Sequence, residues 1–125
     1  MKRLLVTVAL FALVAFIGFN LLTPGTARAQ TTDDCALTPT IASLTTCVEH
    51  AASQGLITSQ GVANSLLAKL NAAQAGLDRG QTSVAINKLQ AFIHEVQAQA
   101  GKHIDAMHAQ HMVMHAQLVI QALGG

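Results

Sequence analysis

The chain has 125 residues and a formal net charge of +1 with histidine neutral; 51% of its residues are hydrophobic, 10% charged and 3% aromatic. This length supports one small domain rather than several. The few basic residues form no patch or stripe, which argues against nucleic acid as a partner. The scarcity of aromatic side chains argues against a sugar-stacking platform.

The N-terminal stretch has the pattern of a secretory signal peptide. A basic start, Met1-Lys2-Arg3, precedes an almost unbroken apolar run from Leu4 to Leu22. Pro24-Gly25 breaks the helix, and Ala27-Arg28-Ala29 places small residues at the two positions that a signal peptidase reads. We therefore expect residues 1–29 to be cleaved and the mature protein to be secreted or extracytoplasmic, in the periplasm or on the cell surface. The rival interpretation is an uncleaved membrane anchor, because about 20 apolar residues span a bilayer.

Removal of residues 1–29 would leave four basic and six acidic residues, a net charge of −2, with all six histidines and both cysteines retained. Because an exported chain meets an oxidising environment, we expect Cys35 and Cys47 to form a disulfide. A disulfide that closes a loop this short contributes roughly 3 kcal/mol to the free energy of unfolding in the chain-entropy model. A redox or metal-binding thiol pair is the alternative, and the spacing disfavours it because it is not Cys-x-x-Cys.

Residues 30–38 read as a polar lead-in, which we expect to be poorly ordered apart from Cys35. Thr38-Pro39 has the pattern of a capping hydroxyl followed by proline at the first helical position. Apolar residues then recur at helical spacing until Gly55, which we expect to end the first helix.

Two further helices follow with the same helical spacing of apolar residues. Their expected limits are Thr58 or Ser59 to Asp78-Arg79-Gly80, and Thr82 or Ser83 to Gly101. The third of the four helices carries Phe92, the only aromatic residue expected to remain in the mature chain.

The fourth helix is expected from about Ile104 to Leu123, where apolar residues recur at i, i+3, i+4 and i+7. No segment alternates with period two, so we expect no sheet. Short links between amphipathic helices favour antiparallel neighbours. The predicted fold is therefore all-α: a small antiparallel bundle of four amphipathic helices over residues 39–123, after a cleaved signal peptide.

Several sequence blocks between Gly55 and Leu123 form a recognisable pattern. They are Gly55-Leu56-Ile57, Ser65-Leu66-Leu67-Ala68-Lys69-Leu70, Ala85-Ile86-Asn87-Lys88-Leu89, Ala91-Phe92-Ile93-His94-Glu95-Val96 and Gly101-Lys102-His103-Ile104. This pattern resembles the FIMAH-type domain, a small helical module that recurs near the C-termini of large secreted bacterial proteins, often hydrolases. The resemblance implies an extracellular, non-catalytic accessory or interaction module, and it supplies no binding residues. The last helix departs from the pattern because it carries histidine and methionine where ordinary polar residues are expected.

That last helix holds the sharpest chemical feature of the sequence. On a helix, His108, His111 and His115 fall on one flank beside the apolar stripe, with Met107 and Met114 towards solvent. Imidazole and thioether bind copper, and imidazole also suits zinc and nickel, so these five residues are candidate ligands for Cu, Zn or Ni. His108 and His115 lie two turns apart, so we expect a pair of histidines, completed by methionine, water, another histidine or a second copy of the chain.

Three other interpretations of this helix remain open. Histidine can stand in for glutamine or lysine on a solvated face, and added metal would then bind adventitiously. Clustered imidazoliums repel one another in acid, which would make the helix respond to pH. Met107, Met114 and Leu118 can instead form a partner-binding face, since methionine adapts to many surfaces, and a homodimer through this helix would use the same face.

The sequence shows no pattern of a catalytic site. Catalysis needs a nucleophile with a base, paired carboxylates or a metal with an open position, whereas Glu49, Glu95 and Asp105 lie on different expected helices. We therefore predict that the protein is not an enzyme. The favoured function is a secreted, non-catalytic helical module that binds a protein or cell-envelope partner. A small extracytoplasmic metal-binding protein is the first alternative, and a pH-responsive helical module is the second.

Overall fold

A computed structural model describes residues 35–125 of the protein, so the expected signal peptide and its cleavage site lie outside the described residues. The elements are α2 (Ile41–Ser53), α3 (Gln60–Asp78), α4 (Thr82–Gln99) and α5 (Ala106–Ala122). The described part of the chain contains no strand, only isolated bridges that join Ile57 and Ala100 to Ile104. The all-α class is thereby confirmed. Within residues 35–125, no helix is long and apolar enough to cross a membrane.

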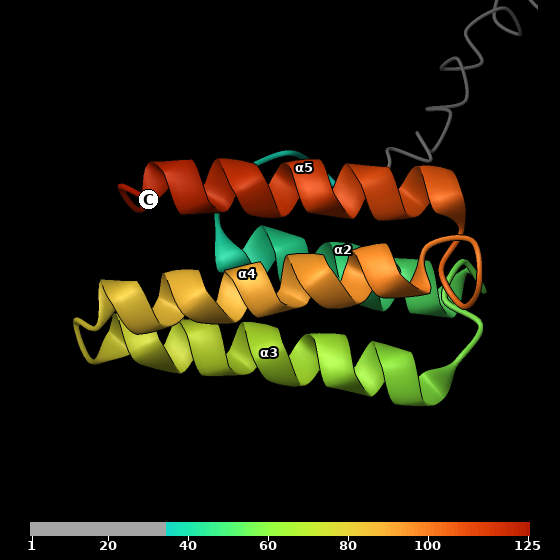
Figure 1. The fold of residues 1–125 in the computed structure, drawn as a ribbon, viewed down its shortest axis with the longest axis horizontal. Helices are drawn as coiled ribbons and strands as arrows, with labels where there is room; N and C mark the ends of the chain where they lie inside the picture. Colours follow the sequence, from blue (N-terminus) through green and yellow to red (C-terminus); the bar gives the residue numbers. More distant parts are fainter. Residues whose placement is uncertain (1–34) are drawn as a thin grey trace, which may run out of the picture. The chain divides into compact units, whose positions relative to one another are not determined.

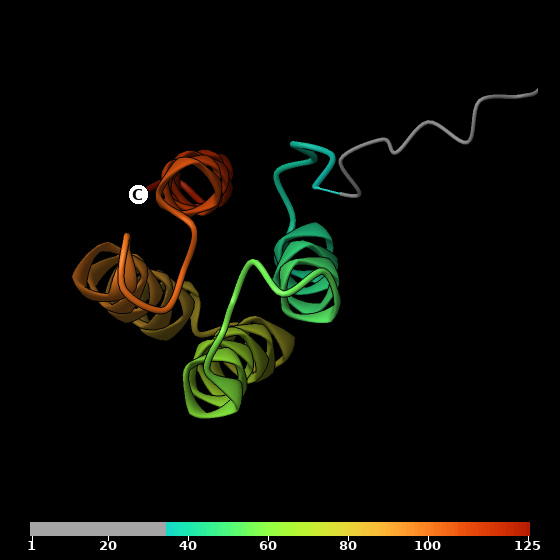
Figure 2. The same ribbon diagram turned by 90° about the vertical axis from the view of Figure 1, so that its right-hand side faces the viewer.

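The four helices pack as a ring in chain order. Each helix contacts the next, and α5 closes the ring against α2. Successive helices run in opposite directions (Figure 1), and the view along the bundle places the four at its corners (Figure 2). The short links force this arrangement, because a chain that turns back within a few residues must lay its next helix beside the last. The predicted antiparallel four-helix bundle is confirmed.

The helix ends agree with the sequence patterns at α3 but not at α2. Ser59 caps α3 by accepting a hydrogen bond from the amide of Val62 at 3.4 Å. The expected cap at Thr38 is wrong, because Thr40 caps α2 and its Oγ1 accepts from the amide of Ser43 at 3.2 Å. The carbonyl of Thr38 is hydrogen-bonded to His115 of α5, so Thr38 and Pro39 belong to the segment that contacts α5. The helix begins after this segment, at Ile41.

The other two helices begin close to their expected positions. α4 starts at Thr82, but no side-chain hydrogen bond caps it, and Gln81 occupies the cap position. α5 starts at Ala106 rather than Ile104, because the carboxylate of Asp105 accepts from the amide of His108 at 2.9 Å. Ile104 lies in the preceding loop and is buried there.

The core is aliphatic and runs along the axis of the ring. Each helix contributes side chains with no exposed surface: Leu44 and Val48 from α2, Leu66 and Leu70 from α3, Leu89 and Phe92 from α4, and Met112 and Ala116 from α5. Alanines at Ala63, Ala73 and Ala85 are also buried. Their small volume lets neighbouring helices approach closely.

A close backbone approach also involves Gly76, near the end of α3. A Cβ atom there would lie 3.3 Å from the backbone nitrogen of Ala85 and 3.4 Å from the carbonyl oxygen of Gln81. The carbonyl of Gly76 also accepts from the amide of Gln81 at 2.8 Å. The turn between α3 and α4 is therefore packed directly on the backbone of α3.

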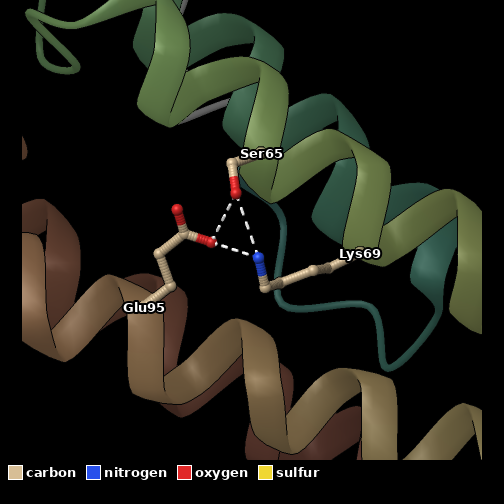
Figure 3. Close-up of polar contacts among 3 residues, drawn as sticks. All are labelled: Ser65, Lys69 and Glu95. Atoms are coloured by element: carbon tan, nitrogen blue, oxygen red, sulfur yellow. Dashed lines mark hydrogen bonds and ion pairs between the residues drawn. The ribbon is translucent and has the colours of Figure 1, made fainter.

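A polar triad links the same two helices at the surface (Figure 3). The ammonium of Lys69 lies 2.6 Å from the Glu95 carboxylate, and their side chains are 29% and 19% exposed. The Ser65 hydroxyl donates to the same carboxylate at 2.9 Å and accepts from Lys69 at 3.0 Å. Three partly buried polar groups thus satisfy one another across the α3–α4 contact.

Two leucine substitutions in α3 separate helix propensity from packing. Gly61→Leu adds a good helix former at an exposed site, where a Cβ atom would meet only the Ser59 hydroxyl at 3.7 Å, and we expect stability within about 1 kcal/mol of wild type, on the stabilising side. Gly76→Leu drives a side chain into the backbone of the turn and should cost about 1–3 kcal/mol or more. Urea denaturation of both variants measures the difference, and equal stabilities would contradict the packing described.

The Lys69–Glu95 ion pair of the triad should contribute modestly to the free energy of unfolding. A double-mutant cycle with Lys69→Met and Glu95→Gln is expected to give a coupling free energy of about 0.5–1 kcal/mol, because both side chains are only partly desolvated. The coupling should fall in concentrated salt, since screening weakens pairs that water reaches. Urea denaturation at low and high salt measures it; a coupling of zero at low salt would show that the contact does not stabilise the fold.

Candidate functional site

Residues 35–40, here called the N-terminal segment, lie against α2 and α5. The predicted disulfide between Cys35 and Cys47 is present, with 4.4 Å between the two Cα atoms. Cys47 is fully buried in α2 and Cys35 is 3% exposed. The Ser43 hydroxyl adds a hydrogen bond to the carbonyl of Ala36 at 2.7 Å. These contacts attach Cys35 and Ala36 to α2.

The structure places His115 in the core, although the sequence pattern put it on one flank of the last helix with His108 and His111. The side chain has no exposed surface. Its Nε2 lies 2.7 Å from the carbonyl oxygen of Thr38, which accepts the hydrogen bond. Its Nδ1 is buried and has no hydrogen-bond partner. The N-terminal segment, invisible to a helical projection of α5, covers this flank and accepts the hydrogen bond from Nε2, which leaves the lone pair of the neutral ring on the buried Nδ1.

His108 and His111 remain near the surface, and both are half-buried. Their ring centroids are 6.3 Å apart and meet edge to face. Together with Leu56, Asp105 and Met107 they line a hollow of about 420 Å³, here called the histidine hollow. Three of the five predicted metal ligands therefore share one hollow.

Met114 lies apart from the histidine hollow, in a groove between α4 and α5. This groove, here called the α4–α5 groove, has a volume of about 310 Å³. Its walls are alanines, Val113 and Met114, and its polar groups are the amides of Gln97, Gln110 and Gln117. No charged residue lines it. The groove therefore offers apolar contact and uncharged hydrogen-bonding groups.

The predicted partner face of Met107, Met114 and Leu118 is only partly open. Met107 is 80% exposed and Met114 is 44% exposed, whereas Leu118 is half-buried. Met107 borders the histidine hollow and Met114 borders the α4–α5 groove. The stripe expected from the sequence therefore divides between two hollows.

Sequence reasoning missed one cluster of chemically active groups. The ligand atoms of Cys35, Cys47 and His108 all lie within 4.8 Å of one another. Cys35 Sγ is 3.8 Å from His108 Nε2, although the residues are 73 positions apart in the chain. No spacing pattern could have signalled this group, because only the folding of the N-terminal segment onto α5 creates it.

The Ser65–Lys69–Glu95 triad resembles a serine with an adjacent amine base, but its hydrogen bonds point the wrong way. Lys69 donates to the Ser65 hydroxyl and is paired with Glu95. An ammonium that donates in this way has no lone pair with which to accept the serine proton. The triad therefore serves to join α3 and α4.

The sequence matches the model of a known protein family. The sequence model of the FIMAH domain matches residues 41–121, which spans all four helices. The chain belongs to the FIMAH domain family. The resemblance seen in the sequence blocks is confirmed, and the match begins in α2 rather than at Gly55. Membership makes this domain a helical accessory module. No curated protein and no solved structure matches the chain.

Calorimetric titration of the disulfide-bonded protein with Cu(II) and Ni(II) tests which histidines remain available. We expect His115→Gln to leave any measured affinity unchanged, because that imidazole is buried and already bonded to Thr38. His111→Gln should weaken binding by about tenfold or more, since even the loss of a ligand's supporting partner costs that much. Circular dichroism checks that both variants fold. An equal loss in the two variants would contradict the assignment of His115 to the core.

Proposed function

We propose that this protein is an exported, non-catalytic interaction module and that its α4–α5 groove receives an apolar polypeptide segment of a cell-envelope or secreted partner. The observation that carries the proposal is the composition of the groove: apolar walls, three amides and no charge. An adaptable methionine, 44% exposed, stands at its edge.

The chemistry of the groove selects the class of partner. Anionic ligands and nucleic acids require cationic or backbone-amide donors, and no charged residue lines the groove. Glutamine amides can both donate to and accept from a peptide backbone. Alanine and valine walls contribute the apolar contact that burying a hydrophobic side chain needs. A polypeptide with apolar side chains satisfies both requirements.

Three observations support work outside the cytoplasm. The sequence begins with a basic and apolar pattern typical of secretory signals. The two cysteines form a disulfide, as is common in oxidising compartments. The chain belongs to a family of helical accessory modules. Together they favour the periplasm, the cell surface or the medium.

The histidine hollow supports a second candidate function, a small extracytoplasmic metal-binding protein. Met107, His108 and His111 line that hollow, and thioether and imidazole suit copper. The titration of the histidine variants described above tests this function separately, because Met107, His108 and His111 do not line the α4–α5 groove.

Site-specific photo-crosslinking in the producing cells tests the interaction function. A photoreactive residue at Gln110, in the groove, is expected to give one or a few defined adducts. The same residue at Asn71, exposed on α3, serves as the matched control, because α3 does not contact α5. Met114→Glu should reduce the Gln110 adducts by about tenfold, since a buried unpaired charge opposes docking.

The masses of the adducts identify the occupant. An adduct of twice the chain mass would identify the homodimer through the last helix. Adducts of other masses would identify separate partners. If Gln110 and Asn71 give the same adducts, or if Met114→Glu changes nothing, the groove is not a docking site and the proposal fails.

A further inference from the structure

The cluster of Cys35, Cys47 and His108 offers a second chemistry when its disulfide is open. In the folded protein the two sulfur atoms are bonded to each other, and all three ligand atoms lie within 4.8 Å. The three residues come from three different parts of the fold: the N-terminal segment, α2 and α5. A cation held by all three would join the same parts that the disulfide and the contacts of His108 and His115 now join.

We propose that reduction of the Cys35–Cys47 disulfide converts this cluster into a Zn²⁺ site, with two thiolates and the His108 imidazole as ligands and water in the fourth position. A dithiol reductant supplies the two electrons and two protons: the sulfur–sulfur bond breaks, two thiols form, and the reductant becomes a disulfide. Zn²⁺ then displaces one proton from each thiol. The set of two cysteines and one histidine with an open position is an established zinc coordination.

The distances suit zinc once the sulfur atoms separate. Bond lengths of about 2.3 Å to sulfur and about 2.0 Å to nitrogen place tetrahedral ligand atoms roughly 3.5–3.8 Å apart. The 3.8 Å between Cys35 Sγ and His108 Nε2 already lies at this spacing. The two sulfur atoms must move apart, because they are bonded to each other in the oxidised protein. Cys35 can move because it precedes the first turn of α2, whereas Cys47 is fixed within that helix.

Burial and charge favour a divalent ion over a monovalent one. Cys47 has no exposed surface and Cys35 has 3%, so an uncompensated charge there would be costly. Two thiolates with Zn²⁺ and a neutral imidazole carry no net charge, whereas the same ligands with Cu⁺ would leave one negative charge buried. The histidine hollow, which His108 lines, gives the ion a path from solvent.

The site would exist only in the reduced protein, because sulfur atoms bonded to each other are not thiolates. This separates it from the Met107 and His111 face, which is present in both redox states. It also gives the chain a way to hold the N-terminal segment on α2 and α5 before oxidation or under reducing conditions.

Anaerobic titration with Zn²⁺ against a chelating indicator, and with Co²⁺ as a spectroscopic probe, tests the proposal. The protein is purified with its natural N-terminal sequence, whether or not residues 1–29 have been cleaved. A phosphine reductant opens the disulfide. We expect one Zn²⁺ per reduced chain, at least about tenfold tighter than in the oxidised protein, and a thiolate-to-cobalt charge-transfer band. His108→Gln should weaken binding by about tenfold or more, and Cys35→Ser with Cys47→Ser should abolish the band.

His111→Gln is the matched control, since His111 adjoins His108 but lies outside the cluster. It should leave the affinity of the reduced protein within about threefold, because it removes no ligand. Equal losses in His108→Gln and His111→Gln would place the metal on the histidine pair and overturn the proposal. Equal affinities of the reduced and oxidised proteins would also overturn it.

The stability of the reduced protein supplies an independent readout. If reduction lowers its helical circular dichroism, Zn²⁺ should restore the signal in wild type and not in His108→Gln, because binding a metal to the folded state stabilises that state. Failure of Zn²⁺ to restore the wild-type signal would overturn the proposal. If reduction leaves the helices intact, the titration alone decides. The crosslinking outcome at the α4–α5 groove is independent of both readouts.

Discussion

The disulfide between Cys35 and Cys47 holds the N-terminal segment in the angle between α2 and α5, and much of the chemistry of the protein follows from that position. With Cys35 fixed, the carbonyl of Thr38 meets Nε2 of His115, and Cys35 Sγ approaches His108. A small aliphatic core in which Phe92 is the one buried phenylalanine of residues 35–125 supplies only a small free energy of unfolding. A covalent link that restricts the unfolded chain is therefore a large contribution in a domain of this size, about 3 kcal/mol in the chain-entropy model.

Because the N-terminal segment covers one flank of α5, the two sides of this helix present different chemical groups. One side, with His108 and His115, faces the N-terminal segment. The other side, with Val113 and Met114, meets α4 and forms a groove without charge. The packing of the helix thus separates Met114 from the histidine hollow, whereas Met107 lines that hollow with His108 and His111. A metal and a polypeptide partner could occupy this helix without competing for the same side chains.

The sequence blocks that identify the FIMAH family lie mainly in the α3–α4 half of the bundle. Leu66, Leu70, Leu89 and Phe92 fill the core there, and Ser65, Lys69 and Glu95 join the two helices. These residues determine how the helices pack. They do not line the α4–α5 groove or the histidine hollow, which explains why family membership defines the fold without naming a ligand.

The sequence by itself determined the four helices, their antiparallel order, the disulfide and the family, because helical periodicity, capping hydroxyls and short links are local properties of the chain. It did not determine which threonine caps α2, since Thr38 and Thr40 offer the same hydroxyl and only the contacts of the N-terminal segment distinguish them. Nor did it show that His115 is buried: a helical projection puts that residue beside His108 and His111 but cannot show what packs against each. The tertiary structure decided that His115 is buried and that Cys35 and His108, 73 positions apart, lie together. Both outcomes depend on where a non-helical segment crosses two helices, and no local pattern encodes that position.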